Sequence, residues 1–190
     1  MAQQTLLQAS VGAQSLLVKA LAVLGGSAVI ALGAQVSVPM LPVPMTLQTL
    51  AILMVGLTAG SRLGAAAVIA YLIEGAMGLP VFSGGGAGAA WLAGPTGGFL
   101  FGFVAMAFGA GWLVERGIAR GFVGTLLSAV LVSALLYVPG VLWLDAATGL
   151  DLTGALNAGM VPFLLGDVVK SVIAALVVTG AWSALRARRG

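Results

Sequence analysis

Long apolar runs, separated by short segments rich in Gly, Pro or charged residues, set the pattern of this chain. No charged residue occurs in residues 20–61 or in residues 75–114. A run of about 20 apolar residues is long enough to cross the hydrocarbon core of a bilayer as a helix. The pattern therefore predicts an all-α integral membrane protein.

The breaks between the apolar runs predict six transmembrane helices in a single domain that covers residues 1–190. Pro39, Pro42 and Pro44 end the first helix, because proline removes a backbone donor and clashes with the preceding turn. As one helix, residues 45–78 would be about 50 Å long, too long for a core of about 30 Å. We therefore expect a hairpin of two short helices there. The predicted spans are 16–35, 45–59, 62–78, 96–113, 122–144 and 160–185.

Basic residues lie in the segments that six spans place on one side of the membrane. The loops at residues 36–44, 79–95 and 145–159 contain neither Lys nor Arg. They are long, and the last could hold one helical turn, so they suit lids or binding loops. The positive-inside rule predicts that both termini are cytoplasmic. The basic residues concerned are Lys19, Arg62, Arg116, Arg120, Arg186, Arg188 and Arg189.

The composition excludes several functions. Only 7% of the residues are charged, against about 25% in a typical soluble domain, so lipid surrounds much of this chain. The net charge of +3 is small and spread out, which argues against a nucleic-acid partner. The chain has no Cys and no His, so it lacks the usual metal ligands and the commonest nucleophile–base pairs. We expect no metal site, no cofactor and no enzymatic activity.

Asp167 and Lys170 are the strongest candidates for ligand binding. They lie in the stretch FLLGDVVKS, and a spacing of three places them on the same face of a helix. An ionisable residue inside a membrane span costs several kcal/mol if it is alone, so it faces protein or water. Gly166 would let a ligand approach beside them. The alternative is an ion pair that only fixes helix packing.

Three other polar positions lie near the same, outer side. Glu74, near the outer end of the third span, points either into the bundle or toward the lipid headgroups. Gln48 and Thr49, at the outer start of the second span, either contact a ligand or hold helices together. Thr96 lies beside the first amides of the fourth span.

The Gly-rich loop between the third and fourth spans is a further candidate. Gly84, Gly85 and Gly86 could present backbone N–H groups to an anion, or they could make a flexible lid. Phe82 and Trp91 flank these glycines. The two aromatic rings could cover an apolar ligand, and they could equally anchor the chain at the membrane interface.

Small residues recur at a spacing of four in the first span. The pairs are Ala22 with Gly26, and Ser27 with Ala31. Such pairs let two helices approach closely. On spacing alone, packing within this chain is the simpler explanation, and a surface for a partner subunit is the other.

Three stretches, taken in order, resemble the BioY family: PVPMTLQTLAILMVGLTAGSRLGAAAVIAYLIEGAMGLPVFSGGGAG, GPTGGFLFGF and VPFLLGDVVKSVIAA. The resemblance implies a six-helix S component of an energy-coupling factor (ECF) transporter in a bacterial plasma membrane. It also implies an outward-facing biotin site that includes Asp167 and Lys170. In this family, small residues of the first helix contact a transmembrane coupling subunit, which carries two cytoplasmic ATPases. Some members have an Arg in the Gly-rich loop, where this chain has Gly86.

High-affinity biotin uptake is therefore the predicted function. The nearest alternative is the same fold with another small vitamin as its ligand. A different class is a small intramembrane enzyme that uses Asp167 and Glu74, and a third is a purely structural membrane subunit. Because the chain has no nucleotide-binding motif, ATP would be used only by partner subunits.

Overall fold

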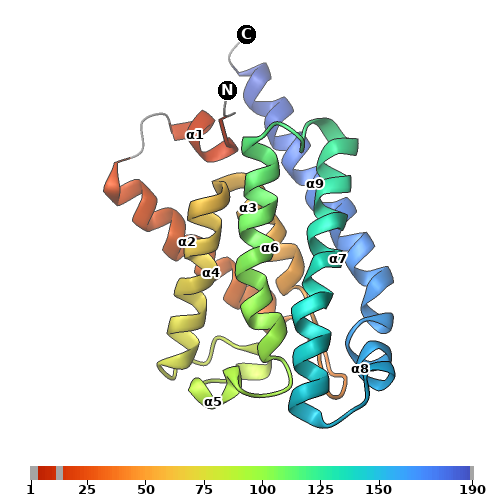
Figure 1. Ribbon diagram of the computed structural model, residues 1–190. Helices are drawn as coiled ribbons and strands as arrows, with labels where there is room; N and C mark the ends of the chain where they lie inside the picture. Colours follow the sequence, from red (N-terminus) through yellow and green to blue (C-terminus); the bar gives the residue numbers. More distant parts are fainter. Residues whose placement is uncertain (1–3, 12–14, 189–190) are drawn as a thin grey trace.

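The structure, a computed structural model, describes residues 4–11 and 15–188, so Arg189 lies outside the described residues. The α-helices are α1 (Leu6–Val11), α2 (Leu16–Gln35), α3 (Gln48–Ala59), α4 (Ser61–Ala76), α5 (Ala89–Leu92), α6 (Gly97–Glu115), α7 (Gly121–Thr148), α8 (Leu152–Gly159) and α9 (Leu164–Ala187). The 3₁₀ helices are η1 (Ser83–Gly85) and η2 (Val161–Phe163), and the strands are β1 (Ser37–Val38) and β2 (Met45–Thr46). In Figure 1, α1 lies at one end of the bundle, and α5 and α8 lie at the other.

The prediction of an all-α fold is confirmed, apart from one small ribbon. The longer helices α2, α3, α4, α6, α7 and α9 overlap the predicted spans. Within the described residues, four stretches are long and apolar enough to cross a membrane: Leu16–Gln35, Gly97–Glu115, Gly121–Thr148 and Leu152–Ala187. Helices α3 and α4 have only 12 and 16 residues, as expected for two short helices in a hairpin.

The hairpin between α3 and α4 is held tightly against α6. Gly60 makes the turn with a φ of +92°, a conformation that side chains other than glycine rarely adopt. A Cβ atom on Gly111 of α6 would lie 2.2 Å from the backbone nitrogen of Ser61, so the two backbones touch there. The carboxylate of Glu115 accepts hydrogen bonds from the Ser61 N–H (2.8 Å) and Oγ (2.7 Å). Glu115 therefore caps the start of α4.

Two segments contain more helix than the sequence predicts. The polar N-terminal segment forms α1, because Thr5 and Gln8 make a reciprocal capping box with distances of 3.3 and 3.0 Å. The loop after α7 holds the 8 residues of α8, two turns rather than one. Asp151 caps α8 by accepting a hydrogen bond from the Gly154 N–H at 2.9 Å.

The loop between α2 and α3 contains regular structure. Its two ends pair as the antiparallel ribbon β1–β2, with Ser37 opposite Thr46 and Val38 opposite Met45. The ribbon leads straight into α3, so the residues just before and at the start of α3 are fixed in position.

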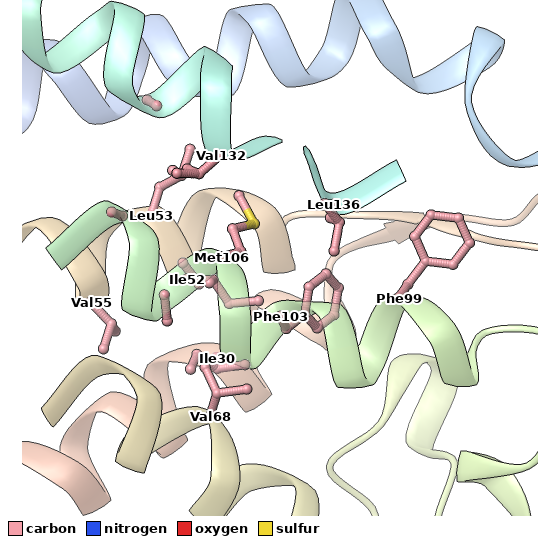
Figure 2. Close-up of a cluster of buried hydrophobic side chains, with 14 of the residues drawn as sticks. Ile30, Ile52, Leu53, Val55, Val68, Phe99, Phe103, Met106, Val132 and Leu136 are labelled. Carbon is pink, nitrogen blue, oxygen red and sulfur yellow. The ribbon is translucent and has the colours of Figure 1, made fainter. Parts of the chain in front are cut away.

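Helix α6 forms the centre of the bundle. In the most apolar window of α6, 67% of the residues are buried, against 17% for α2. Figure 2 shows Met106 of α6 between Ile52 of α3 and Val132 of α7, and Phe103 of α6 facing Leu136 of α7. Many large side chains on the outside of α2 and α7 are exposed and apolar, as expected for surfaces that face lipid. This arrangement leaves the polar side chains of the spans to meet inside the bundle.

Candidate ligand-binding site

A cavity lies among α3, α6, α7 and α9, toward the end of the bundle that carries α5. It leaves about 60 Å³ for the centres of water molecules, enough for a few waters. The lining residues are Val43, Pro44, Thr46, Gln48, Thr49, Ser83, Trp91, Thr96, Phe99, Leu100, Phe103, Leu136, Tyr137, Phe163, Asp167 and Lys170. Part of its apolar wall, Phe99, Phe103 and Leu136, is visible in Figure 2.

Asp167 and Lys170 form a buried ion pair in the polar wall of this cavity. The Lys170 Nζ lies 3.0 Å from the Asp167 Oδ1, and the two side chains are 9% and 7% exposed. Asp167 Oδ1 also accepts from the Thr49 hydroxyl at 3.0 Å, and Oδ2 accepts from the Tyr137 hydroxyl at 2.6 Å. Lys170 donates a second hydrogen bond to Thr49 Oγ1 at 3.0 Å. The charges are thus paired and linked to α3 and α7.

The start of α9 explains why the carboxylate is stable at this depth. Asp167 lies in the first turn of α9, where the helix dipole favours a negative charge. The Ser171 hydroxyl donates to the Asp167 backbone oxygen at 2.7 Å. A Cβ on Gly166 would lie 3.4 Å from the Met45 sulfur, and Gly166 is not among the residues that line the cavity.

The hydrogen bonds of Gln48 hold the start of α3 in place. Gln48, which is 4% exposed, donates from Nε2 to the Tyr71 hydroxyl at 2.8 Å. Its Oε1 accepts from the Thr46 hydroxyl at 3.2 Å. Gln48, Thr49 and Thr46 all line the cavity, and Gln48 joins α3 to α4.

Two tyrosines take part in these two sets of hydrogen bonds, and neither was predicted from the sequence. The chain contains only 2 Tyr residues, and Tyr71 and Tyr137 both lie within apolar helices. A buried tyrosine hydroxyl usually finds a hydrogen-bond partner. A tyrosine in the middle of a membrane span is therefore a signal that could have identified them.

Three aromatic rings pack against one another beneath the Gly-rich loop. The Phe82 ring is fully buried, edge-on to Tyr71 at 5.5 Å and parallel to Trp91 within 16° at 6.4 Å. Phe82 is thus part of the core and not an interfacial anchor. Trp91, 38% exposed, lines the cavity. Gly86 makes room for it, because a Cβ there would lie 2.7 Å from the Trp91 ring.

The N–H groups of Gly85 and Gly86 in the Gly-rich loop donate to acceptors within the chain. The Gly85 N–H donates to Gln35 Oε1 at 3.1 Å and to the Phe82 oxygen at 3.1 Å. Gln35 Nε2 also donates to the Phe82 oxygen at 3.0 Å. The loop is therefore tied to the end of α2 through Gln35. Gly84 has a positive φ of 67°, and Ser83 and Thr96 line the cavity.

Glu74 lies away from the cavity and does not point to lipid. Its carboxylate accepts a hydrogen bond from Ser27 Oγ of α2, so it joins α4 to α2. Gly26 also allows α2 and α4 to pack closely within this chain, because a Cβ there would lie 2.8 Å from the Ala67 Cβ. Ala31 packs against the core. Ala22 and Gly26 line a separate, largely apolar groove.

The fold and the cavity together describe a multi-pass membrane protein with a small, mainly apolar cavity between its helices. This chain belongs to the BioY family, which it matches over residues 4–187. It is 41% identical over 151 residues to the biotin transporter BioY of Thermotoga maritima, which covers 80% of this chain and 88% of that protein. It is 40% identical over 152 residues to the biotin transporter BioY of Rhizobium etli, and this match covers 75% of this chain and 79% of that protein.

A solved structure is similar along nearly the whole length of the chain. The crystal structure of an S component for biotin from an ECF-type ABC transporter superposes with a TM-score of 0.79 at 27% identity. The match covers 94% of this chain and 96% of that one. The relatives are transporters, so the intramembrane enzyme considered above is ruled out: this chain is not an enzyme.

Proposed function

We propose that this chain binds biotin and serves as the substrate-specific subunit of an ECF transporter in a bacterial plasma membrane. The observation that carries the proposal is the buried Asp167–Lys170 pair in the wall of an otherwise apolar cavity. The names of the BioY relatives and the biotin S component support the same ligand.

The hydrogen bonds left open by the pair match the ureido group of biotin. An ammonium has three N–H donors, and Lys170 uses two of them. A carboxylate has about four acceptor positions, and Asp167 uses three. One donor and one acceptor remain for a ligand. We infer that the ureido oxygen accepts from Lys170 and that a ureido N–H donates to Asp167.

The apolar part of biotin has matching surfaces. Phe99, Leu100 and Phe103 of α6 provide the apolar wall of the cavity, and Trp91 lies under the Gly-rich loop. Isothermal titration of the purified chain with biotin tests the proposal. We expect one biotin molecule to bind per chain, with a higher affinity than any other vitamin in a panel. Failure to bind biotin while another vitamin binds would select the same fold with a different ligand.

A partner surface is proposed in the half of the bundle away from the ligand cavity. A groove of about 530 Å³ runs between α2 and α3, and Ala22, Gly25 and Gly26 line it. Small residues let a second helix approach closely, which fits the transmembrane coupling subunit and, through it, two cytoplasmic ATPases. Of the four residues predicted for this surface, Ser27 and Ala31 instead face the chain's own core.

Gly25 is the best position at which to test this surface. A Cβ on Gly25 meets nothing within 4 Å, so the side chain of Gly25→Trp can enter the groove without a clash at its Cβ, whereas a Cβ on Gly26 would lie 2.8 Å from Ala67 of α4. Gly180→Trp is the control, because a Cβ there also meets nothing within 4 Å and Gly180, on α9, does not itself line the groove. We expect Gly25→Trp alone to abolish co-purification with the coupling subunit while biotin binding stays unchanged. Normal co-purification of Gly25→Trp would exclude the groove.

A further inference from the structure

The side chain of Gln35, the last residue of α2, binds the backbone of the Gly-rich loop with both ends of its amide. Its Nε2 donates to the backbone oxygens of Val81 (3.2 Å) and Phe82 (3.0 Å). Its Oε1 accepts from the Gly85 N–H at 3.1 Å. An amide side chain carries donors at one end and an acceptor at the other, so Gln35 pairs with the loop as a backbone peptide group would.

This part of the loop has few other attachments. In the described part of the chain, every hydrogen bond that residues 81–86 make outside their own turn goes to Gln35, and the rest stay within residues 79–86. The Phe82 ring is buried, but the other residues of the segment are half-buried or exposed. The position of the segment therefore depends on the Phe82 ring and on Gln35.

The same segment supports one wall of the ligand cavity. Ser83 lines the cavity directly, and so does Trp91 of α5. The Trp91 ring lies parallel to Phe82 at 6.4 Å and fits against Gly86, where a Cβ would lie 2.7 Å from it. Holding the backbone of residues 82–86 in place therefore also holds the Trp91 ring against the cavity.

Gln35 is separate from the ligand site that it helps to cover. It is not among the residues that line the cavity, so it offers no contact to a ligand there. Its bonds to the loop are the same whether the cavity is filled or empty. A contact of this kind stabilises the closed loop equally in both cases, so its loss speeds entry and exit of a ligand together. The dissociation constant, their ratio, stays nearly unchanged.

We propose that Gln35 is a positioning residue that latches the Gly-rich loop over the cavity and so sets the rates at which the ligand enters and leaves. Gly78 and Gly88, on either side of the loop, have φ values of +102° and +95°, and a Cβ on either would meet nothing within 4 Å. They are positions at which the backbone can turn when the loop opens. The inference rests on the proposed function, because biotin is the ligand whose exchange is measured.

Binding kinetics of labelled biotin to the full chain in detergent test this latch. Gln35→Met keeps an unbranched side chain that suits a helix but removes the three hydrogen bonds to the loop. We expect the association rate and the dissociation rate, the latter from a chase with unlabelled biotin, both to rise about tenfold. The dissociation constant should stay within about twofold of the wild type. Unchanged rates, or slower association with weaker affinity, would overturn the latch.

Gln8→Met is the matched control, because it makes the same substitution in α1, at the other end of the bundle, and removes the hydrogen bond from the Thr5 N–H. It should leave both rates unchanged, and equal acceleration in both variants would overturn the latch.

Hydrogen exchange of the peptide that covers residues 81–88 tests the loop without any ligand. Exchange should be about tenfold faster in Gln35→Met than in the wild type or Gln8→Met. Unchanged exchange would overturn the latch, whereas faster exchange in a chain that fails to bind biotin would support the latch and reject only the proposed ligand.

Discussion

Replacing the charges of Asp167 and Lys170 is the sharpest test of the ligand site. Asn at Asp167 keeps the size of the side chain, and its oxygen can still accept from Thr49 and Lys170, which lie 3.0 Å from Oδ1. What is lost is the negative charge that would meet a ureido N–H. A hydrogen bond to a charged group contributes about 1.5–3 kcal/mol, so biotin affinity should fall roughly ten- to hundredfold. Lys170→Met should have a similar effect.

Stability alone does not distinguish a ligand role from a packing role. Either single variant leaves one charge buried without its partner, which costs about 3–5 kcal/mol, so both explanations predict lower melting temperatures. The double variant Asp167→Asn/Lys170→Met removes both charges, and an ion pair replaced by neutral groups can regain stability. We expect it to recover stability but to bind biotin no better than the single variants.

Isothermal titration and melting curves on the same preparations provide the comparison. Ser171→Ala is the control, because Ser171 is buried one turn from Asp167 and bonds its backbone oxygen but does not line the main cavity. This control should lose some stability and bind biotin within about twofold of the wild type. Wild-type affinity in the Asp167→Asn/Lys170→Met variant would refute the reasoning and leave the pair as a packing element.

Three further predictions test other parts of the molecule. Cysteines introduced at Ser83 and Thr148 should react with an impermeant maleimide outside intact cells while Arg188→Cys does not, and the reverse pattern would invert the topology. Gly86→Ala should lower biotin affinity by displacing the Trp91 ring, which a Cβ would approach to 2.7 Å; unchanged affinity would show that the ring does not contact the ligand. Among the described residues, Ser133 Oγ is buried without a hydrogen-bond partner. Ser133→Ala should therefore melt no lower than the wild type, since an unsatisfied buried hydroxyl costs about 1–3 kcal/mol; a lower melting temperature would mean that this hydroxyl has a partner.

The helices and the charged pair could be predicted from the sequence because each depends on a local signal. Apolar runs mark the spans, and a charge inside such a run stands out without any knowledge of its neighbours. Asp167 and Lys170 are also three residues apart on one helix, so their contact follows from helix geometry alone. The capping box of Thr5 and Gln8 is equally local, and it was missed because the segment is short and polar.

Contacts between distant segments could not be predicted in the same way. Tyr137 reaches Asp167 only because α7 and α9 are rotated to face each other, and the rotation of an apolar helix depends on packing. Glu74 and Ser27 were both noticed, yet their hydrogen bond across 47 positions changes the interpretation of each. Gln35 holds the Gly-rich loop across 50 positions, and nothing around it in the sequence indicates that role.

The paired charges also explain how the site can exist in a membrane before a ligand arrives. An isolated buried charge would be costly, so an empty site needs its own partners. Thr49 and Tyr137 supply them to Asp167 from α3 and α7, and Lys170 completes the neutral cluster from α9 itself. Because one donor of Lys170 and one acceptor of Asp167 stay open, a neutral ligand group with both functions can bind without breaking the cluster. We expect the proposed site to favour a ureido-like group over a simple anion, because an anion would use only the open donor of Lys170 and would be repelled by the carboxylate of Asp167.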